Sequence, residues 1–175
     1  MEQEHQVFGN KKAYSRMEIL RQLKNFTKSK SDMLQIYKVY IRSVVEQSCT
    51  VWSSSLAKHN IRELERVQKV ATRIILGNNY SYEERLTELN ISTLKDRRNE
   101  LSLRFANKCL KQEKTKHIFK RNSKMHKMKL RRKDTFKLQN AKTERLRKSS
   151  VLHMTRQLNK KEEEKRRILD KYNQT

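Results

Sequence analysis

The sequence predicts an all-α protein, built as a small helical bundle followed by a basic tail that is partly disordered or extended as helix. The 175 residues include no proline and only two glycines, whereas β-hairpins and sheet corners depend on such turn residues. Apolar residues recur at three- and four-residue intervals over residues 14–110, which is the period of amphipathic helices. Only 34% of the residues are hydrophobic and 35% are charged, so we expect one compact domain with an extension.

The formal net charge of +24 is spread unevenly along the chain. Residues 1–110 carry a net charge of +8, whereas residues 111–175 carry +16. The second part also has few large apolar residues, so we do not expect it to bury a core by itself. We therefore expect a flexible N-terminus at 1–13, a helical bundle at 14–110, and a basic tail at 111–175 with a C-terminal helix.

The first two helices are predicted by spacing and capping residues. A short helix is expected over residues 14–26, where Met17, Leu20 and Leu23 recur every three residues. Ser31 or Asp32 is expected to cap a second helix. Its buried face would comprise Met33, Ile36, Tyr37, Tyr40, Ile41, Val44 and Val45.

Three further helix starts follow from short motifs. Asn60 and Glu63 have capping-box spacing, and Gly77 is placed to end the helix that carries Leu64, Val67, Ala71, Ile74 and Ile75. Ser81 and Glu84 repeat the box before Leu86 and Leu89. Ser92 or Thr93 is expected to cap a last long helix, whose apolar positions are Leu94, Leu101, Phe105 and Cys109.

The residue patterns that usually carry catalysis or hold metal are not found. The five histidines and two cysteines do not pair at metal-ligand spacing, and no glycine-rich phosphate loop or nucleophile elbow is present. We expect no catalytic residue, no metal and no cofactor. Cys49 and Cys109 are expected to be reduced core residues. No membrane span or secretory signal is visible, so we expect a protein of the nucleus or cytoplasm.

Basic residues carry the strongest functional signal. At 100° per residue, Arg62, Arg66, Lys69 and Arg73 fall on one stripe, opposite the apolar face of the same helix. Such a stripe suits a phosphate backbone, although a solvated face that maintains solubility is an equally good interpretation. Glu65 lies beside the stripe and weakens the first interpretation. Arg97, Arg104 and Lys108 are expected to line up similarly on the last helix.

A tighter basic cluster lies in the tail, at Lys129, Arg131, Arg132 and Lys133. Phe119 and Phe136 lie nearby in the sequence, and cations with interleaved aromatic residues suit nucleic acid by charge and base stacking. The same run is typical of a nuclear import signal, or of a disordered basic tail with no single partner. Tyr37, Tyr40 and Trp52 are expected to be core residues rather than a stacking platform.

Several stretches, taken in order, resemble the region just after the catalytic palm in reverse transcriptases of jockey-type non-LTR retrotransposons. The series spans about Met17 to Lys160. It comprises LRQLK (Leu20–Lys24), YKVYIRSVVEQ (Tyr37–Gln47), CTVW (Cys49–Trp52), LERVQKVATRIILG (Leu64–Gly77), YEERLTELNISTL (Tyr82–Leu94), RRNEL (Arg97–Leu101), TERLRKSSV (Thr143–Val151) and LNK (Leu158–Lys160).

The resemblance implies the thumb, a helical bundle that grips the primer–template duplex, and the tail beyond it. It implies RNA or DNA as a partner, as duplex or hybrid and without sequence specificity. The family's Y/F-A-D-D signature and its endonuclease domain lie upstream of the matched region, so no catalytic residue is carried over and we do not expect this chain to be active alone. The family commonly has proline where this chain has Ser43 and Thr50, so helix is expected to continue there.

The same sequence is also compatible with a different class of function, protein binding. A thumb normally packs on a palm, so an apolar patch near Val51, Trp52 and Leu56 is expected to be exposed and to bind a protein partner. The chain would then be a helical protein-interaction module. The third interpretation is a decayed retroelement fragment with no selected activity.

Overall fold

The computed structural model describes residues 2–26, 29–122 and 135–172, and within them it confirms the predicted all-α class. Helices account for the regular structure of these residues, and their only β feature is an isolated antiparallel bridge between Arg121 and Phe136. The chain divides into two compact units, residues 1–52 with 56–98 and residues 53–55 with 99–175. We call them unit 1 and unit 2. The division falls inside helix α7 (Leu94–Lys111), before the compositional boundary near Lys111.

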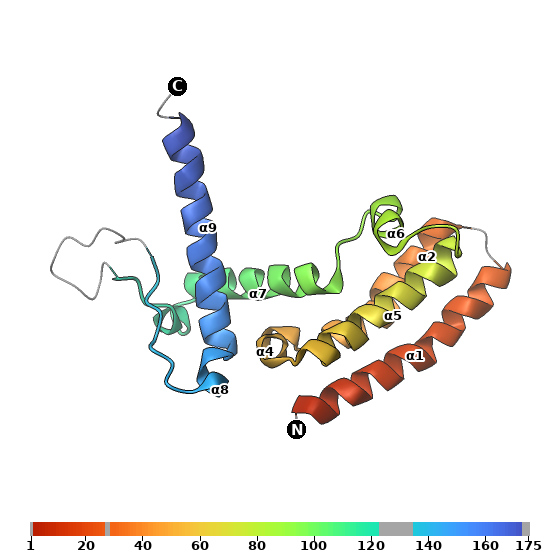
Figure 1. Ribbon diagram of the computed structural model, residues 1–175, viewed down its shortest axis with the longest axis horizontal. Coiled ribbons are helices and arrows are strands. Elements are labelled where there is room, and N and C mark those ends of the chain that lie inside the picture. The colour runs from red at the N-terminus through yellow and green to blue at the C-terminus, as the bar shows by residue number, and fades with distance from the viewer. Residues whose placement is uncertain (1, 27–28, 123–134, 173–175) are drawn as a thin grey trace. The chain divides into compact units, whose positions relative to one another are not determined.

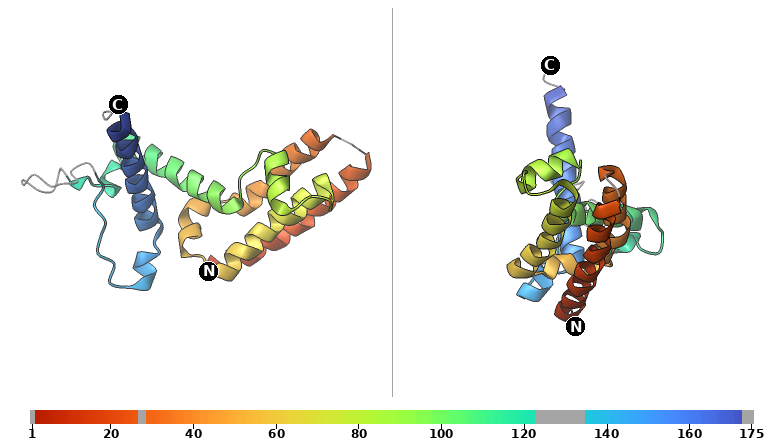
Figure 2. Two further views of the ribbon diagram at one scale, coloured as in Figure 1. Left: turned by 45° about the horizontal axis from the view of Figure 1, so that its top comes forward. Right: turned by 90° about the vertical axis from the view of Figure 1, so that its right-hand side faces the viewer.

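Unit 1 is a bundle in which α1 (Glu2–Phe26) lies along α5 (Lys58–Leu76), as Figures 1 and 2 both show. Between α1 and α5 in the sequence lies a continuous helical segment. It is made of α2 (Lys30–Ile36), a π-helical stretch (Tyr37–Arg42) and α3 (Ser43–Glu46). Ser43 thus lies within continuous helix, as expected from the absence of proline. The chain then turns through Ser48, with φ 53°, into α4 (Cys49–Trp52).

The core of unit 1 is formed by apolar residues at helical spacing. Its buried members are Ala13, Met17, Leu20, Met33, Tyr37, Ile41, Val45, Leu64, Val67, Ala71, Ile75, Leu89 and Leu94. Two residues of the predicted faces differ from expectation, because Tyr40 is 39% exposed and Phe105 is 47% exposed. On α7 the buried residues include Leu94 and Cys109, as predicted, together with Arg98, Ser102 and Ala106. Cys49 and Cys109 are both buried and free, as predicted.

Two predicted helix starts and one predicted helix end are confirmed. Ser81 and Glu84 form the reciprocal capping box of α6 (Tyr82–Glu88), the Thr93 hydroxyl accepts from the Asp96 N–H of α7 at 3.1 Å, and Gly77 ends α5 with φ 91°. The predicted cap of α2 was wrong, because Ser29 caps this helix rather than Ser31 or Asp32. The Ser29 side chain accepts a hydrogen bond from the Asp32 N–H.

Two other starts were wrong. The capping box at Asn60 and Glu63 does not form, because α5 begins earlier, at Lys58, after the extended residue Ala57. α1 begins at Glu2 instead of Tyr14. Ala13 is fully buried against the core of unit 1, so the buried face of α1 extends beyond the predicted helix start. In both cases the helix continues through residues that the sequence motif placed outside it.

A buried polar network around Gln68 joins three segments of unit 1. Gln68 is 0% exposed. Its Oε1 accepts from the Tyr37 hydroxyl at 2.7 Å, and its Nε2 donates to the Tyr82 hydroxyl at 3.1 Å and to the Ser92 carbonyl at 2.9 Å. The pKa of Tyr37 is raised well above its usual range, mainly because burial disfavours the phenolate. Each amide atom of Gln68 is therefore satisfied, which buried polar groups require.

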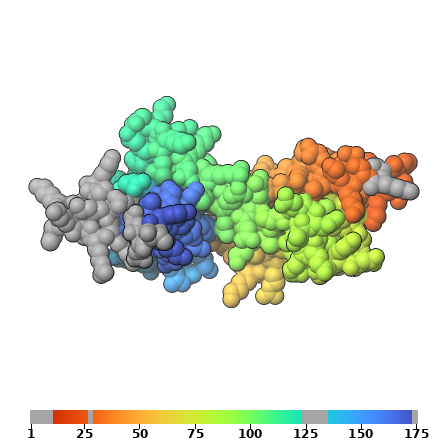
Figure 3. Space-filling view, turned by 90° about the horizontal axis from the view of Figure 1, so that it is seen from above, coloured from red at the N-terminus to blue at the C-terminus, as the bar shows by residue number. Residues whose placement is uncertain are grey.

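α6 is also joined to α2 at the surface of unit 1. Lys30 and Glu88 form an ion pair at 3.5 Å, and Figure 3 shows the orange start of α2 beside the yellow-green α6. Both side chains are more than half exposed, so this pair contributes little to stability compared with the Gln68 network.

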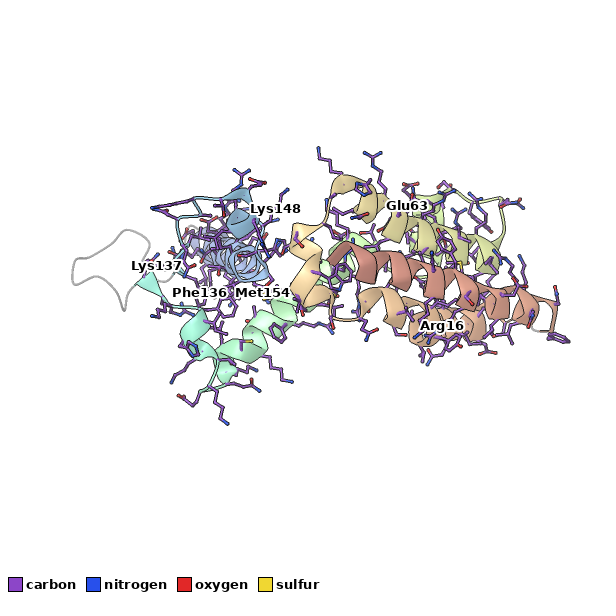
Figure 4. All side chains as sticks on the ribbon, turned by 90° about the horizontal axis from the view of Figure 1, so that it is seen from below. Arg16, Glu63, Phe136, Lys137, Lys148 and Met154 are labelled. Carbon is purple, nitrogen blue, oxygen red and sulfur yellow. The ribbon has the colours of Figure 1, made fainter. Side chains whose placement is uncertain are left out.

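Unit 2 has a core that the basic tail forms together with the second half of α7. The second half of α7 contributes Ala106 and Cys109, and the tail contributes Phe119, Phe136, Met154 and Leu158. The tail helices are α8 (Glu144–Arg147) and α9 (Ser150–Tyr172), preceded by a 3-10 turn at Lys116–Ile118. Phe136 and Met154 are labelled in Figure 4. The tail buries a core because it packs against α7, which lies before the compositional boundary.

The backbone at Phe136 is held by a single side chain of α9. Asn159 Oδ1 accepts from the Phe136 N–H at 2.7 Å, and Asn159 Nδ2 donates to the Phe136 carbonyl at 3.0 Å. These two bonds satisfy the Phe136 N–H and carbonyl, which a neighbouring strand would satisfy in a sheet. They also connect the segment around Phe136 to α9.

We predict that Tyr37→Phe destabilises unit 1 by about 1–3 kcal/mol, because Gln68 Oε1 loses its partner in the core. Urea denaturation followed by the fluorescence of Trp52, which belongs to unit 1, measures the change. Tyr40→Phe is the matched control, because the Arg16 contact with the Tyr40 ring and the Tyr40 carbonyl needs no hydroxyl. Equal stability of the Tyr37→Phe variant and the native protein would contradict the network.

We also predict that Asn159→Ala destabilises unit 2 by about 1–3 kcal/mol, since two buried backbone groups lose their partner. Helical circular dichroism during thermal unfolding provides the measurement, and Asn140→Ala, at an exposed position, is the control. A variant with unchanged thermal unfolding would show that Asn159 does not hold Phe136.

Candidate nucleic-acid interface

The four predicted cations of α5 lie on one exposed face, which we call the α5 cation row: Arg62, Arg66, Lys69 and Arg73. Four-, three- and four-residue steps bring side chains to the same side of an α-helix. The opposite face of α5 is buried and contributes Leu64, Val67, Ala71 and Ile75 to the core. The predicted arrangement of the row, exposed and backed by a buried face, is therefore confirmed.

Only weak local contacts engage the α5 cation row. Arg66 Nη1 lies 3.8 Å from Glu63 Oε1, and both side chains are at least half exposed, so the pair contributes little. Lys69 Nζ lies 5.0 Å from the centre of the Tyr82 ring. In the described part of the chain, no ion pair engages Arg62 or Arg73. The row thus presents positive charge that a ligand can reach.

Glu65, the acidic residue beside the α5 cation row, has its side chain engaged by hydrogen bonds within unit 1. Its Oε1 accepts from the Tyr82 hydroxyl and, at 3.2 Å, from the Leu94 N–H. Burial, followed by this hydrogen bond to Glu65, raises the pKa of Tyr82. The carboxylate is thereby used to hold α5, α6 and the start of α7 together.

Arg98 is a buried cation whose charge interacts with that of Glu65. Its side chain is 4% exposed, and burial lowers the pKa of its guanidinium while the charge of Glu65 opposes that effect. Glu65 Oε2 and Arg98 Nη1 are both buried without a hydrogen bond. A buried carboxylate oxygen is less costly with a cation nearby, and the favourable effect of Glu65 on the pKa of Arg98 agrees with such an interaction.

Arg97 differs from the other predicted cations of α7. Its Nε lies 3.3 Å from Glu46 Oε1, which also lies 3.4 Å from Arg42 Nε. The Arg97 and Glu46 side chains are only 24% and 14% exposed. Arg97 therefore joins two helical segments of unit 1 and does not continue an exposed row.

The other two predicted cations of α7, Arg104 and Lys108, belong to unit 2 and are exposed. Arg104 Nη2 lies 2.5 Å from Glu100 Oε1, one turn before it, and Lys108 follows one turn later. Phe105, predicted as core, lies beside Arg104 on the exposed side of the helix. An exposed aromatic residue between two cations is a feature that sequence spacing missed, because Phe105 also fits the apolar pattern.

The basic cluster of Lys129, Arg131, Arg132 and Lys133 lies outside the described residues. Its two proposed stacking partners are described, and both are core residues: Phe119 is 4% exposed and Phe136 is 2% exposed. Their rings are not available to stack on bases, so that part of the prediction was wrong. Arg121 lies over the Phe136 ring at 4.7 Å and helps to cover it.

Sequence reasoning also missed a cation–aromatic contact between α1 and the π-helical stretch. The Arg16 guanidinium lies 4.2 Å from the centre of the Tyr40 ring, and Arg16 Nη1 donates to the Tyr40 carbonyl at 2.6 Å. Arg16 and Glu63 are labelled in Figure 4. Arg16 is half-buried, so this contact joins helices and adds little to a binding surface.

Metal and membrane features can be stated for the described residues alone. Within 2–26, 29–122 and 135–172, no three histidine, cysteine or acidic side chains gather as metal ligands would. Over the same ranges, no helix combines the length and the apolar character that a membrane crossing demands.

Glu63 is exposed beside the α5 cation row, whereas the Glu65 side chain is bound within unit 1, so replacing each by glutamine gives a matched pair of variants. We predict that Glu63→Gln raises nucleic-acid affinity by up to about fivefold, since one exposed repulsive charge is worth up to about 1 kcal/mol. Glu65→Gln should leave the affinity of the folded protein within about twofold and instead lower its stability by about 1–3 kcal/mol. Fluorescence anisotropy with a labelled duplex and urea denaturation measure the two effects. A larger gain in affinity from Glu65→Gln would place that carboxylate at the interface.

Comparisons with known proteins do not add a family to this picture. No protein-family model, no curated protein and no solved structure matches this chain. What the α5 cation row binds therefore has to be inferred from its residues and their geometry.

Proposed function

We propose that this chain is the thumb and post-thumb region of a jockey-type non-LTR retrotransposon reverse transcriptase, and that it binds nucleic acid through phosphate contacts. The observation that carries the binding proposal is the α5 cation row, exposed on one face of a helix whose other face is core. The family proposal is supported by the ordered series of sequence matches from Leu20 to Lys160.

Phosphates are the ligand that best fits the row. Eleven residues separate Arg62 from Arg73, which corresponds to roughly 16 Å along an α-helix. Several phosphates of one strand occur over such a length, at roughly 3.4 Å per residue of duplex. Arginine and lysine contact phosphate oxygens without reading base identity. We therefore propose duplex or hybrid RNA or DNA as the partner, bound without sequence preference.

Binding rather than catalysis is proposed for the described residues. Nucleotide transfer by two metal ions needs converging carboxylates, and several acidic side chains described here pair instead with nearby arginines and lysines, as in Glu100–Arg104 and Glu46–Arg97. Lys129–Lys133 is additionally proposed as a nuclear import signal, because a short run of basic residues is typical of one.

A protein-interaction module is the second candidate, and one side chain favours it. Val51 is 65% exposed. Trp52 and Leu56, the other members of the predicted apolar patch, pack partly against the core of unit 1. The Trp52 Nε1–H donates to the Gln47 carbonyl at 2.8 Å. Light scattering during gel filtration tests this candidate, because a defined oligomer that Val51→Ser disperses would support it.

We predict that the logarithm of the binding constant for duplex DNA falls linearly with the logarithm of salt concentration, with a slope of about −0.9 for each phosphate contacted. Replacing Arg62, Arg66, Lys69 and Arg73 together by glutamine should weaken binding to all sequences and make the slope shallower by about 0.9 per lost contact. Filter binding over a salt series is the measurement.

The control removes the same charge elsewhere in unit 1, by replacing Lys12, Lys24, Lys30 and Lys95 with glutamine. All four lysines are exposed and lie outside α5. An equal loss in both quadruple variants would show that net charge, and not the α5 cation row, binds nucleic acid. Absence of binding at low salt would overturn the proposed function.

A further inference from the structure

Unit 2 contains an open cavity of about 590 Å³ that the proposed function does not use. It lies between the 3-10 turn, the chain segments around Lys120 and Lys137, and the first turns of α9. Small-molecule sites commonly have volumes of roughly 300–1,000 Å³. The residues that line the cavity are His117, Ile118, Lys120, Lys137, Gln139, Leu146, Ser149, Val151, Leu152 and Thr155.

Two lysines lie side by side at this cavity because the backbone pairs them. The Arg121–Phe136 bridge is antiparallel, and the Lys137 N–H donates to the Lys120 carbonyl at 2.8 Å. Lys120 and Lys137 therefore occupy directly opposite positions, and both line the same cavity. Like charges directly opposite on paired segments are destabilising. An anion bound between them would remove that cost.

The polar surroundings of the two lysines also favour an anion. The described lining residues include no aspartate or glutamate, and His117, Ser149 and Gln139 add side chains that can donate hydrogen bonds. Ser149, Val151 and Leu152 bring the N-terminal end of α9 to the cavity. This end carries the positive pole of the 23-residue helix and N–H groups without intrahelical acceptors.

The other part of the lining is apolar and partly exposed. Ile118, Leu146 and Val151 are each 40–41% exposed, and Leu152 is buried at the base. Inorganic phosphate would leave this surface uncovered. A ligand that combines an anionic group with a flat, weakly polar body would cover both parts.

We propose that this cavity binds a nucleoside phosphate, with its phosphate between Lys120 and Lys137 and its base against Ile118, Leu146 and Val151. The ligand is a free mononucleotide or the phosphorylated end of a strand, since the two share this chemistry. The cavity belongs to unit 2, so this binding does not depend on the α5 cation row.

Calorimetric titration of the full chain with adenosine monophosphate tests the proposal. We expect saturable binding to one site, at least tenfold weaker in Lys120→Gln/Lys137→Gln. The control, Lys142→Gln/Lys160→Gln, removes the same charge from exposed positions of unit 2 outside the lining, and should change the affinity less than threefold. Absence of saturable binding, or an equal loss in both double variants, would overturn the proposal.

Further titrations test separately whether the phosphate and the nucleoside of the ligand contribute to binding. Inorganic phosphate and adenosine should each bind at least tenfold more weakly than adenosine monophosphate. Val151→Thr, which keeps the volume of the side chain, should weaken binding of adenosine monophosphate several-fold and leave inorganic phosphate unaffected. Equal affinity for phosphate and adenosine monophosphate would overturn the nucleoside assignment.

The source of the ligand is distinguished with a matched pair of single strands, one carrying a 5′ phosphate and the other a 5′ hydroxyl. Tighter binding of the phosphorylated strand, lost in Lys120→Gln/Lys137→Gln, supports the cavity and identifies a strand end. Binding of adenosine monophosphate without that difference supports the cavity and identifies the free nucleotide. The quadruple α5 variant should retain binding of adenosine monophosphate, which separates this site from the proposed function.

Discussion

α5 has to satisfy two opposite requirements in the same three turns, and unit 1 depends on how it does so. One face supplies Leu64, Val67, Ala71 and Ile75 to the core, and the other carries four cations to the surface. At the border between the two faces, Gln68 accepts and donates hydrogen bonds inward, and Glu65 accepts them. The network that holds the helices together thus uses the Glu65 carboxylate, while the four cations of the row stay exposed.

Unit 2 shows how a chain with few apolar residues still builds a core. Six buried side chains from α7, the segments around Phe119 and Phe136, and α9 form a small cluster. Asn159 completes it by satisfying the Phe136 backbone. This arrangement places Lys120 opposite Lys137 beside the start of α9. Two lysines of the tail thereby line one cavity of unit 2.

The predictions of helix ends that the structure confirms all concern interactions within a few residues, although other such local predictions were wrong. The α6 capping box, the Thr93 cap and the Gly77 stop all depend on contacts between near neighbours, and all three are confirmed. The start of α5 was wrong because Ala57 is extended and the helix begins at Lys58 with no side-chain cap. Phe105 was assigned to the core because its spacing fits, yet packing of unit 2 buries Ala106 and Cys109 and leaves it exposed.

The sequence by itself determined the all-α class and the alignment of the α5 cation row, because the helical period fixes which side chains share a face. Only the tertiary structure decided that Glu65 is bound inside, that Arg97 pairs with Glu46, and that Phe119 and Phe136 are core residues. The same holds for the meeting of Lys120 and Lys137. These outcomes depend on which distant segment covers each side chain, and periodicity carries no information about that choice.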